Sequence, residues 1–167
     1  MDDTTSAIIE ILFGLLALGA MMIPVLGFFV FVGFQNSKRK RIREKILAAN
    51  PGIGEHFPVR YASRERFDAF LKIFPWDSAG IIFRAPQGIV FLGEQMSGNP
   101  IVLQFSPESV QWIGRAPWPN GAVSWFSAAV PGTTHYFTSE TGFFIVGSKS
   151  GTNQIYERLS GVQQLPR

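Results

Sequence analysis

The chain has 167 residues, which is enough for one domain and an additional segment but too few for two ordinary domains. It contains no cysteine, which excludes disulfides, thiolate catalysis and thiolate metal sites. Its net charge of +3 is unevenly distributed, with −3 on residues 1–37, +5 on residues 38–50 and +1 on residues 51–167. Because the last and largest part is close to neutral, the charge pattern argues against nucleic acid as a partner.

The first predicted element is a transmembrane helix over residues 7–34, preceded by a short external N-terminus of residues 1–6. Glu10 is the only charged residue of this stretch, and the 24 residues from 11 to 34 would span about 36 Å as a helix. The hydrocarbon core of a bilayer is about 30 Å thick, so this helix is long enough to cross it. A buried helix of a soluble core fits this stretch less well, because such a helix would not need apolar residues on every face. A cleaved signal peptide also fits less well, because it should have a basic start and a shorter apolar run.

Small residues form a stripe along one face of this predicted helix. The stripe consists of Ala17, Ala20, Pro24 and Gly27, at spacings of three, four and three residues. Small side chains let a second helix approach closely in lipid, so we expect an integral membrane protein partner and a hetero-oligomeric complex. The alternative is that glycine and alanine are simply common in membrane helices, since no strict GxxxG motif is present.

A basic juxtamembrane helix is predicted over residues 35–50, ending at the stop signal Asn50-Pro51-Gly52. Its six bases form a collar next to the span: Lys38, Arg39, Lys40, Arg41, Arg43 and Lys45. Lys and Arg beside a span stay in the cytoplasm, which predicts an inner (plasma) membrane protein with a periplasmic N-terminus and a cytoplasmic C-terminal domain. The collar is also expected to attract anionic lipid head groups, by roughly 1 kcal/mol per base before screening. General lipid affinity is favoured over specific binding of one lipid.

Residues 51–79 are predicted to be a connector. Residues 51–62 have the pattern of a loop or a short extended segment. Ser63 can then cap a short helix that runs to about Phe74, directly before Pro75. Its apolar residues recur at amphipathic spacing and should pack on the following domain: Phe67, Phe70, Leu71 and Phe74.

Residues 80–161 are predicted to form a mainly β domain, followed by a tail over residues 162–167. Short apolar runs alternate with turn residues and predict seven strands in an antiparallel sandwich or barrel: 81–84, 89–93, 101–105, 110–114, 122–130, 134–139 and 143–147. Residues 153–159 then predict a closing helix, with Ile155 and Leu159 on one face and Gly161 as the stop.

The order of these elements resembles that of pleckstrin-homology-like (PH-like) domains, including bacterial ones tethered to a membrane helix. Residues 80–84, residues 88–93 and the closing helix carry the resemblance. It implies that the first four strands form one sheet, the last three form a second, and the helix caps a corner. Members that bind phosphoinositides use clustered bases between the first two strands. Here that loop would be Ala85-Pro86-Gln87, flanked only by Arg84, so the resemblance does not extend to that ligand. Another small antiparallel β-barrel is the alternative fold.

Residues with catalytic or metal-binding chemistry are sparse. The two histidines, His56 and His135, are far apart and lack metal-ligand spacing, and no acid pair suggests acid–base catalysis. We therefore expect no enzyme activity, no cofactor and no metal. The candidate docking residues are Arg115 and Trp118, since Trp and Arg are enriched at binding hot spots and Trp118 lies in a Pro/Gly turn. The alternative is that Trp118 folds back over the barrel end.

These patterns favour a non-enzymatic accessory or scaffold subunit of a larger inner-membrane complex, of the secretion, photosynthetic or respiratory type. The first alternative is a membrane-tethered PH-like module that binds a lipid or another ligand. The second alternative, an enzyme, would require a pocket with convergent polar groups.

Overall fold

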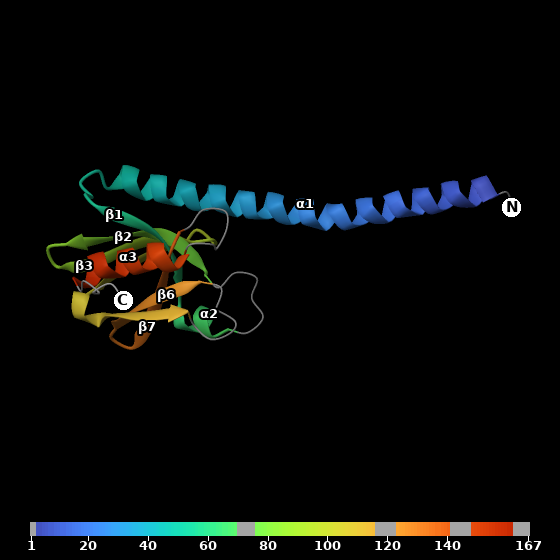
Figure 1. The fold of residues 1–167 in the computed structure, drawn as a ribbon. Helices are drawn as coiled ribbons and strands as arrows, with labels where there is room; N and C mark the ends of the chain where they lie inside the picture. The colour runs from blue at the N-terminus through green and yellow to red at the C-terminus, as the bar shows by residue number, and fades with distance from the viewer. Residues whose placement is uncertain (1–2, 70–75, 116–122, 141–147, 162–167) are drawn as a thin grey trace. The chain divides into compact units, whose positions relative to one another are not determined.

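The computed structural model describes residues 3–69, 76–115, 123–140 and 148–161 (Figure 1). The chain divides into two compact units, residues 1–37 and residues 38–167. Helix α1 (Asp3–Ala49) contributes to both units. It ends directly before Asn50, whose N–H bonds to the carbonyl of Leu47, so the helix stops at the predicted signal.

The first unit is the apolar part of α1. Val32 is buried, at 7% exposed, but the other described large apolar side chains are exposed around the helix: Leu16, Met21, Met22, Ile23, Val25, Leu26, Phe28, Phe29, Val30, Phe31 and Phe34. Within Gly19–Ala49, α1 contains a stretch that by length and composition is apolar enough to cross a membrane. Exposed apolar surface costs about 25 cal/mol per Å² in water, so a helix of this composition favours lipid.

The second unit contains one open antiparallel sheet of seven strands in the order β4-β3-β2-β1-β7-β6-β5. The strands are β1 (His56–Ala62), β2 (Ser78–Ala85), β3 (Gly88–Gln95), β4 (Pro100–Phe105), β5 (Val110–Arg115), β6 (Ser124–Val130) and β7 (Thr133–Ser139). The 3-10 helix η1 (Pro107–Ser109) connects β4 to β5. Strand β1 joins the two halves, because Tyr61 lies opposite Ser78 of β2 and opposite Phe137 of β7. The predicted set of seven antiparallel strands followed by a C-terminal helix is confirmed. The described strands form one open sheet, however, and not the two sheets of a sandwich or a closed barrel.

The strand numbering differs from the prediction. Residues 51–62 were expected to be a connection, but His56–Ala62 form β1, the central strand of the sheet. Pro58 concealed this strand because proline removes a ladder donor and argues against a central position. The structure accommodates it because β1 pairs with β7 only from Val59 onward. The predicted last strand, residues 143–147, lies outside the described residues.

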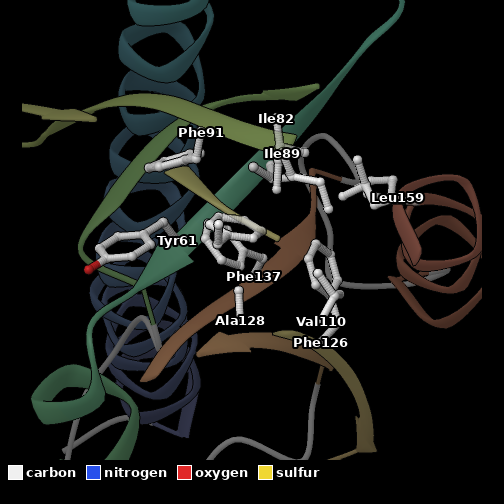
Figure 2. Close-up of a cluster of buried hydrophobic side chains, with 12 residues drawn as sticks. Tyr61, Ile82, Ile89, Phe91, Val110, Phe126, Ala128, Phe137 and Leu159 are labelled. Carbon is white, nitrogen blue, oxygen red and sulfur yellow. The ribbon is translucent and has the colours of Figure 1, made fainter. Parts of the chain in front are cut away.

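Aromatic and aliphatic side chains from every strand fill the sheet's concave face (Figure 2). Phe137 lies at the centre of this core. Its ring centroid is 5.6 Å from Tyr61, 5.2 Å from Phe91, 5.4 Å from Phe126 and 5.8 Å from Phe105. These separations are typical of favourable aromatic pairs.

Helix α3 (Ser148–Ser160) closes one side of this core. Ile155 and Leu159 are buried in it, as their spacing predicted, although the helix begins five residues before the predicted start at 153. Arg84 fixes the end of the helix, because its Nε and Nη2 donate to the carbonyl of Leu159 at 3.1 and 2.7 Å. Gly161 follows with φ of 75°, a conformation that favours glycine at a helix end.

Helix α2 (Arg64–Asp68) follows β1 and is shorter than predicted. Ser63 caps it as expected, since its hydroxyl accepts from the N–H of Arg66 at 3.2 Å. Phe67 packs on the domain and stacks on Tyr136 with ring centroids 3.8 Å apart. The predicted continuation to residue 74 is wrong, because Ala69 already has extended backbone with ψ of 134°. Residues 70–75 lie outside the described part of the chain.

Candidate functional site

The candidate site is the surface that residues 38–49 of α1, here called the docked segment, form with the sheet (Figure 1). Arg39, Ile42, Arg43 and Ile46 recur at spacings of three or four and therefore share one helix face. Ile42 on this face is 4% exposed, whereas Lys40 and Arg41 are exposed. The docked segment is thus amphipathic and turns a mixed apolar and basic face toward the domain.

Glu140 binds two arginines of the docked segment. The Nε of Arg39 donates to its Oε1 at 2.9 Å, and the Nη1 of Arg43 donates to its Oε2. The side chains of Arg39 and Glu140 are 3% and 4% exposed. Glu140 follows β7 directly, and its N–H donates to the carbonyl of Pro58 at 3.1 Å. The sheet therefore fixes the position of this buried carboxylate.

Trp76 supports a further part of this cluster. The guanidinium carbon of Arg60 lies 4.2 Å from the centroid of the Trp76 ring, and that of Arg39 lies 5.9 Å from it. Both distances fit a cation–π contact. Burial lowers the pKa of Arg60 to about 10, with repulsion from Arg39 and Arg43 adding to the effect and Glu140 opposing it. Arg60 therefore stays charged at neutral pH, and the cluster contains three cations and one anion.

The other bases of the collar differ in what they contact. Lys38 Nζ donates to the carbonyl of Met96 at 2.6 Å, and Lys45 Nζ lies 2.7 Å from Glu94 Oε2. Lys40 pairs with Glu44 one turn along the same helix, at 3.8 Å. The structure therefore places Lys38, Arg39, Arg43 and Lys45 against the domain. Binding of the collar to anionic head groups stays a prediction, and the exposed Lys40 and Arg41 are its best-placed members.

The small-residue stripe is open where the structure describes it. Ala20, Pro24 and Gly27 are exposed, and a Cβ added at Gly27 would meet nothing within 4 Å. The side chain of Ala17 lies outside the described residues. The stripe can therefore accept a second helix without rearrangement of its own side chains, and its role in helix packing stays a prediction.

The predicted docking pair is only partly described. Arg115 ends β5 and is exposed, whereas Trp118 lies in residues 116–122, outside the described part. Two other tryptophans of the domain pack on described aromatic residues. Trp112 lies 5.7 Å from Tyr156 of α3, and the fully buried Trp125 packs edge-on against Phe67 at 5.3 Å.

The two histidines are in separate environments. His56 Nδ1 is 2.9 Å from the carbonyl of Gly54, and His135 Nδ1 is 2.9 Å from the hydroxyl of Tyr61 inside the domain. Burial lowers the pKa of His135 and raises the pKa of Tyr61 to about 12, so both are neutral at pH 7. Among the residues that the structure describes, no group of three His, Cys, Asp or Glu side chains could hold a metal ion.

Sequence reasoning did not identify Glu140, Trp76 and Arg60 as members of the site. Glu140 directly follows the predicted strand 134–139, and Arg60 lies in the segment 51–62 that was expected to be a loop or a short extended connection. The available signal was Arg39 and Arg43 at helical spacing beside Ile42, which is the pattern of a helix face that packs on protein.

Comparison of the chain with known proteins adds no relative to this description. No family model, curated protein or solved structure matches it.

Proposed function

We propose that this chain is a single-pass membrane protein that serves as a non-enzymatic accessory or scaffold subunit of a larger inner-membrane complex. The observation that carries the proposal is the division of α1 between an apolar part with exposed side chains and a docked segment bound to a folded domain. The apolar part has the length and composition of a span, and its open stripe offers a face to a second helix. The docked segment then connects the domain to the span through a short stretch of the same chain.

The proposed orientation places the N-terminus in the periplasm and the domain in the cytoplasm. It follows from the bases that begin at Lys38, four residues after the apolar run, since such residues stay on the cytoplasmic side. Pairing within the protein does not weaken this argument, because orientation is set while the chain inserts.

A PH-like identity of the domain is part of the proposal. The strand order β4-β3-β2-β1-β7-β6-β5 and the closing helix α3 support it, since strands 1–4 and 5–7 form two halves joined by the pairing of β1 with β7. The departure from the resemblance is the first connection, which runs from residue 63 to residue 77 and contains α2.

The subunit proposal is tested by purifying the intact chain in several mild detergents and identifying the proteins that accompany it by mass spectrometry. We expect an integral membrane partner. Gly27→Leu places a large side chain on the stripe and should reduce recovery of this partner at least about fivefold. Gly19→Leu is the matched control, since it lies about 120° from the centre of the stripe at about 100° per residue. A lone monomer in every detergent, or equal effects of the two substitutions, would contradict the proposal.

A second candidate function is a tethered module that reads phosphorylated lipid head groups. The corrected strand numbering favours it, because the connection between the first two strands is residues 63–77, which includes Arg64 and Arg66, and not the uncharged loop 85–87. Arg64 is paired with Asp68 at 3.4 Å, but both side chains are exposed and can exchange partners.

The second candidate is tested with the full chain in phosphatidylcholine nanodiscs titrated with soluble inositol phosphates. Saturable binding that Arg64→Gln weakens at least about tenfold would support a lipid-reading module, with Arg158→Gln on α3 as the control of equal charge. Binding that both substitutions weaken equally would indicate unspecific attraction, and absence of binding would remove this candidate.

A further inference from the structure

The turn between β3 and β4, residues 95–99, is bound to the first residue of the docked segment. Lys38 Nζ donates to the carbonyl of Met96 at 2.6 Å. The turn, here called the tip, is closed by bonds from the N–H of Gln95 to the carbonyl of Asn99 at 2.8 Å and from the N–H of Gly98 to the carbonyl of Gln95 at 2.9 Å. Its residues 97–99 are exposed. The tip is therefore an ordered, polar projection of the domain beside Lys38.

Lys38 is also close to the apolar run along the chain, whatever the arrangement of the two units. It follows Phe34, the last residue of the run, by four positions. Because α1 is helical from Phe34 to Lys38 and rises about 1.5 Å per residue, these two residues are only about 6 Å apart along the helix axis. The head-group region of one leaflet is about 5–8 Å thick. A turn that binds Lys38 is therefore within reach of the head groups that surround the end of a span.

We infer that the tip contacts the lipid head-group layer of the leaflet that faces the domain. The inference rests on the proposed function, because it needs α1 to span the membrane. The charge around the tip suits this partner. Residues 95–99 carry no charge. Of the two acids beside them, Glu94 is paired with Lys45 at 2.7 Å, and Asp77, whose carbonyl accepts from the N–H of Met96, has its carboxylate bonded by the Ser63 hydroxyl at 2.8 Å. The exposed Lys40 and Arg41 lie two and three residues beyond Lys38 and attract anionic head groups.

The opposite end of the same strands provides an internal contrast. Strand β3 has eight residues, so its other end, at the turn that contains Gln87, is about 23 Å from the tip. The docked segment also extends away from the tip, toward the end of the strands where Gln87 lies. It runs from Lys38 to Ala49, and the chain then enters β1 at His56, which lies opposite Phe83 near that turn. Gln87 is exposed and should face water.

The absence of cysteine allows each position to be probed singly in the full chain. Ser97→Cys, Gln87→Cys and Val30→Cys are labelled with an environment-sensitive fluorophore and reconstituted into vesicles of phosphatidylcholine and phosphatidylglycerol. Nitroxides on the lipid head groups or deep in the acyl chains then report depth. We expect head-group nitroxides to quench the label at residue 97 at least about threefold more than the label at residue 87, with Asn99→Cys as a second reading of the tip.

Each outcome bears on a different claim. Equal quenching at residues 97 and 87, or shielding of residue 97 from aqueous iodide without nitroxide quenching, would overturn the inference, because the tip would then face water or protein. Quenching at residue 30 by acyl-chain nitroxides tests the span itself. If residue 30 is quenched and residue 97 is not, only the inference fails, whereas absence of quenching at residue 30 contradicts the proposed function.

Discussion

Helix α1 exposes apolar side chains in its first part and buries an arginine in its second part, the docked segment. In the first unit, Met21 and Val30 are each 73% exposed, whereas in the docked segment Arg39 is 2% exposed. A soluble helix would bury the former and expose the latter. One helix therefore shows that the surroundings, and not the residue types, decide what is buried.

A different partner explains each part. Apart from the buried Val32, the described large apolar side chains of the first part are exposed, which suits a lipid environment. A buried arginine is tolerated because Glu140 neutralises it and the Trp76 ring lies near it, so the charge is not left alone in a medium of low dielectric. The contrast between the two parts can be tested by substituting side chains of each part, or their partners in the domain, and measuring the stability of the domain.

The largest effect is expected for Glu140→Ala. The substitution leaves Arg39 buried without its carboxylate and should lower the free energy of unfolding of the domain by about 3–5 kcal/mol. Chemical unfolding of the full chain in micelles measures it. Glu108→Ala, at an exposed position of η1, should change the value by no more than about 0.5 kcal/mol. A loss below 1 kcal/mol for Glu140→Ala would mean that Arg39 reaches water.

The second test compares truncations on the two parts of the same helix. Ile42→Ala removes a side chain that is 4% exposed and should cost about 2–5 kcal/mol of domain stability. Leu26→Ala, at a position 57% exposed, should change the stability of the domain by no more than about 0.5 kcal/mol. Similar losses at both positions, measured by the same unfolding assay, would argue against the contrast.

The smallest effect is expected for Lys45→Ala. The Lys45 side chain is 73% exposed, so its pair with Glu94 should contribute less than about 1 kcal/mol, and that contribution should vanish in about 1 M salt. A loss above about 1 kcal/mol that does not depend on salt would show that exposed pairs such as Lys45–Glu94, and not the buried Arg39–Glu140 pair, hold the docked segment.

Much of the fold could be predicted because its signals are local. The apolar run, the alternation of six strands and the spacing of Ile155 and Leu159 all lie within short stretches of sequence. Strand β1 could not be predicted, because Pro58 and Arg60 interrupt the sequence pattern of a central strand. Only the neighbouring strands and helix in the folded domain make these two residues compatible with that position. Helix α2 was overestimated because amphipathic spacing continues past Ala69, where the backbone becomes extended.

The site was less predictable than the fold because it depends on distant residues. Arg39 and Glu140 are 101 positions apart, and no local pattern marks a glutamate after a strand as the partner of a helix. The collar bases were read as ligands for lipid because the sequence shows their charge but not the surface that receives them. The docking role of Trp118 and the strand expected over residues 143–147 remain predictions.

The central claim, that the docked segment is held by a buried ion pair, is tested most directly by a double-mutant cycle of Arg39→Met and Glu140→Leu. Glu140→Leu leaves the buried Arg39 without a carboxylate and also unpairs Arg43, whereas Arg39→Met leaves Glu140 paired with Arg43 alone. The double variant removes both members of the buried Arg39–Glu140 pair. The measured quantity is the free energy of unfolding of the domain in the full chain. The account predicts a coupling energy of about 2–3 kcal/mol, with the double variant more stable than the two single losses would give. A coupling energy below about 0.5 kcal/mol would contradict it.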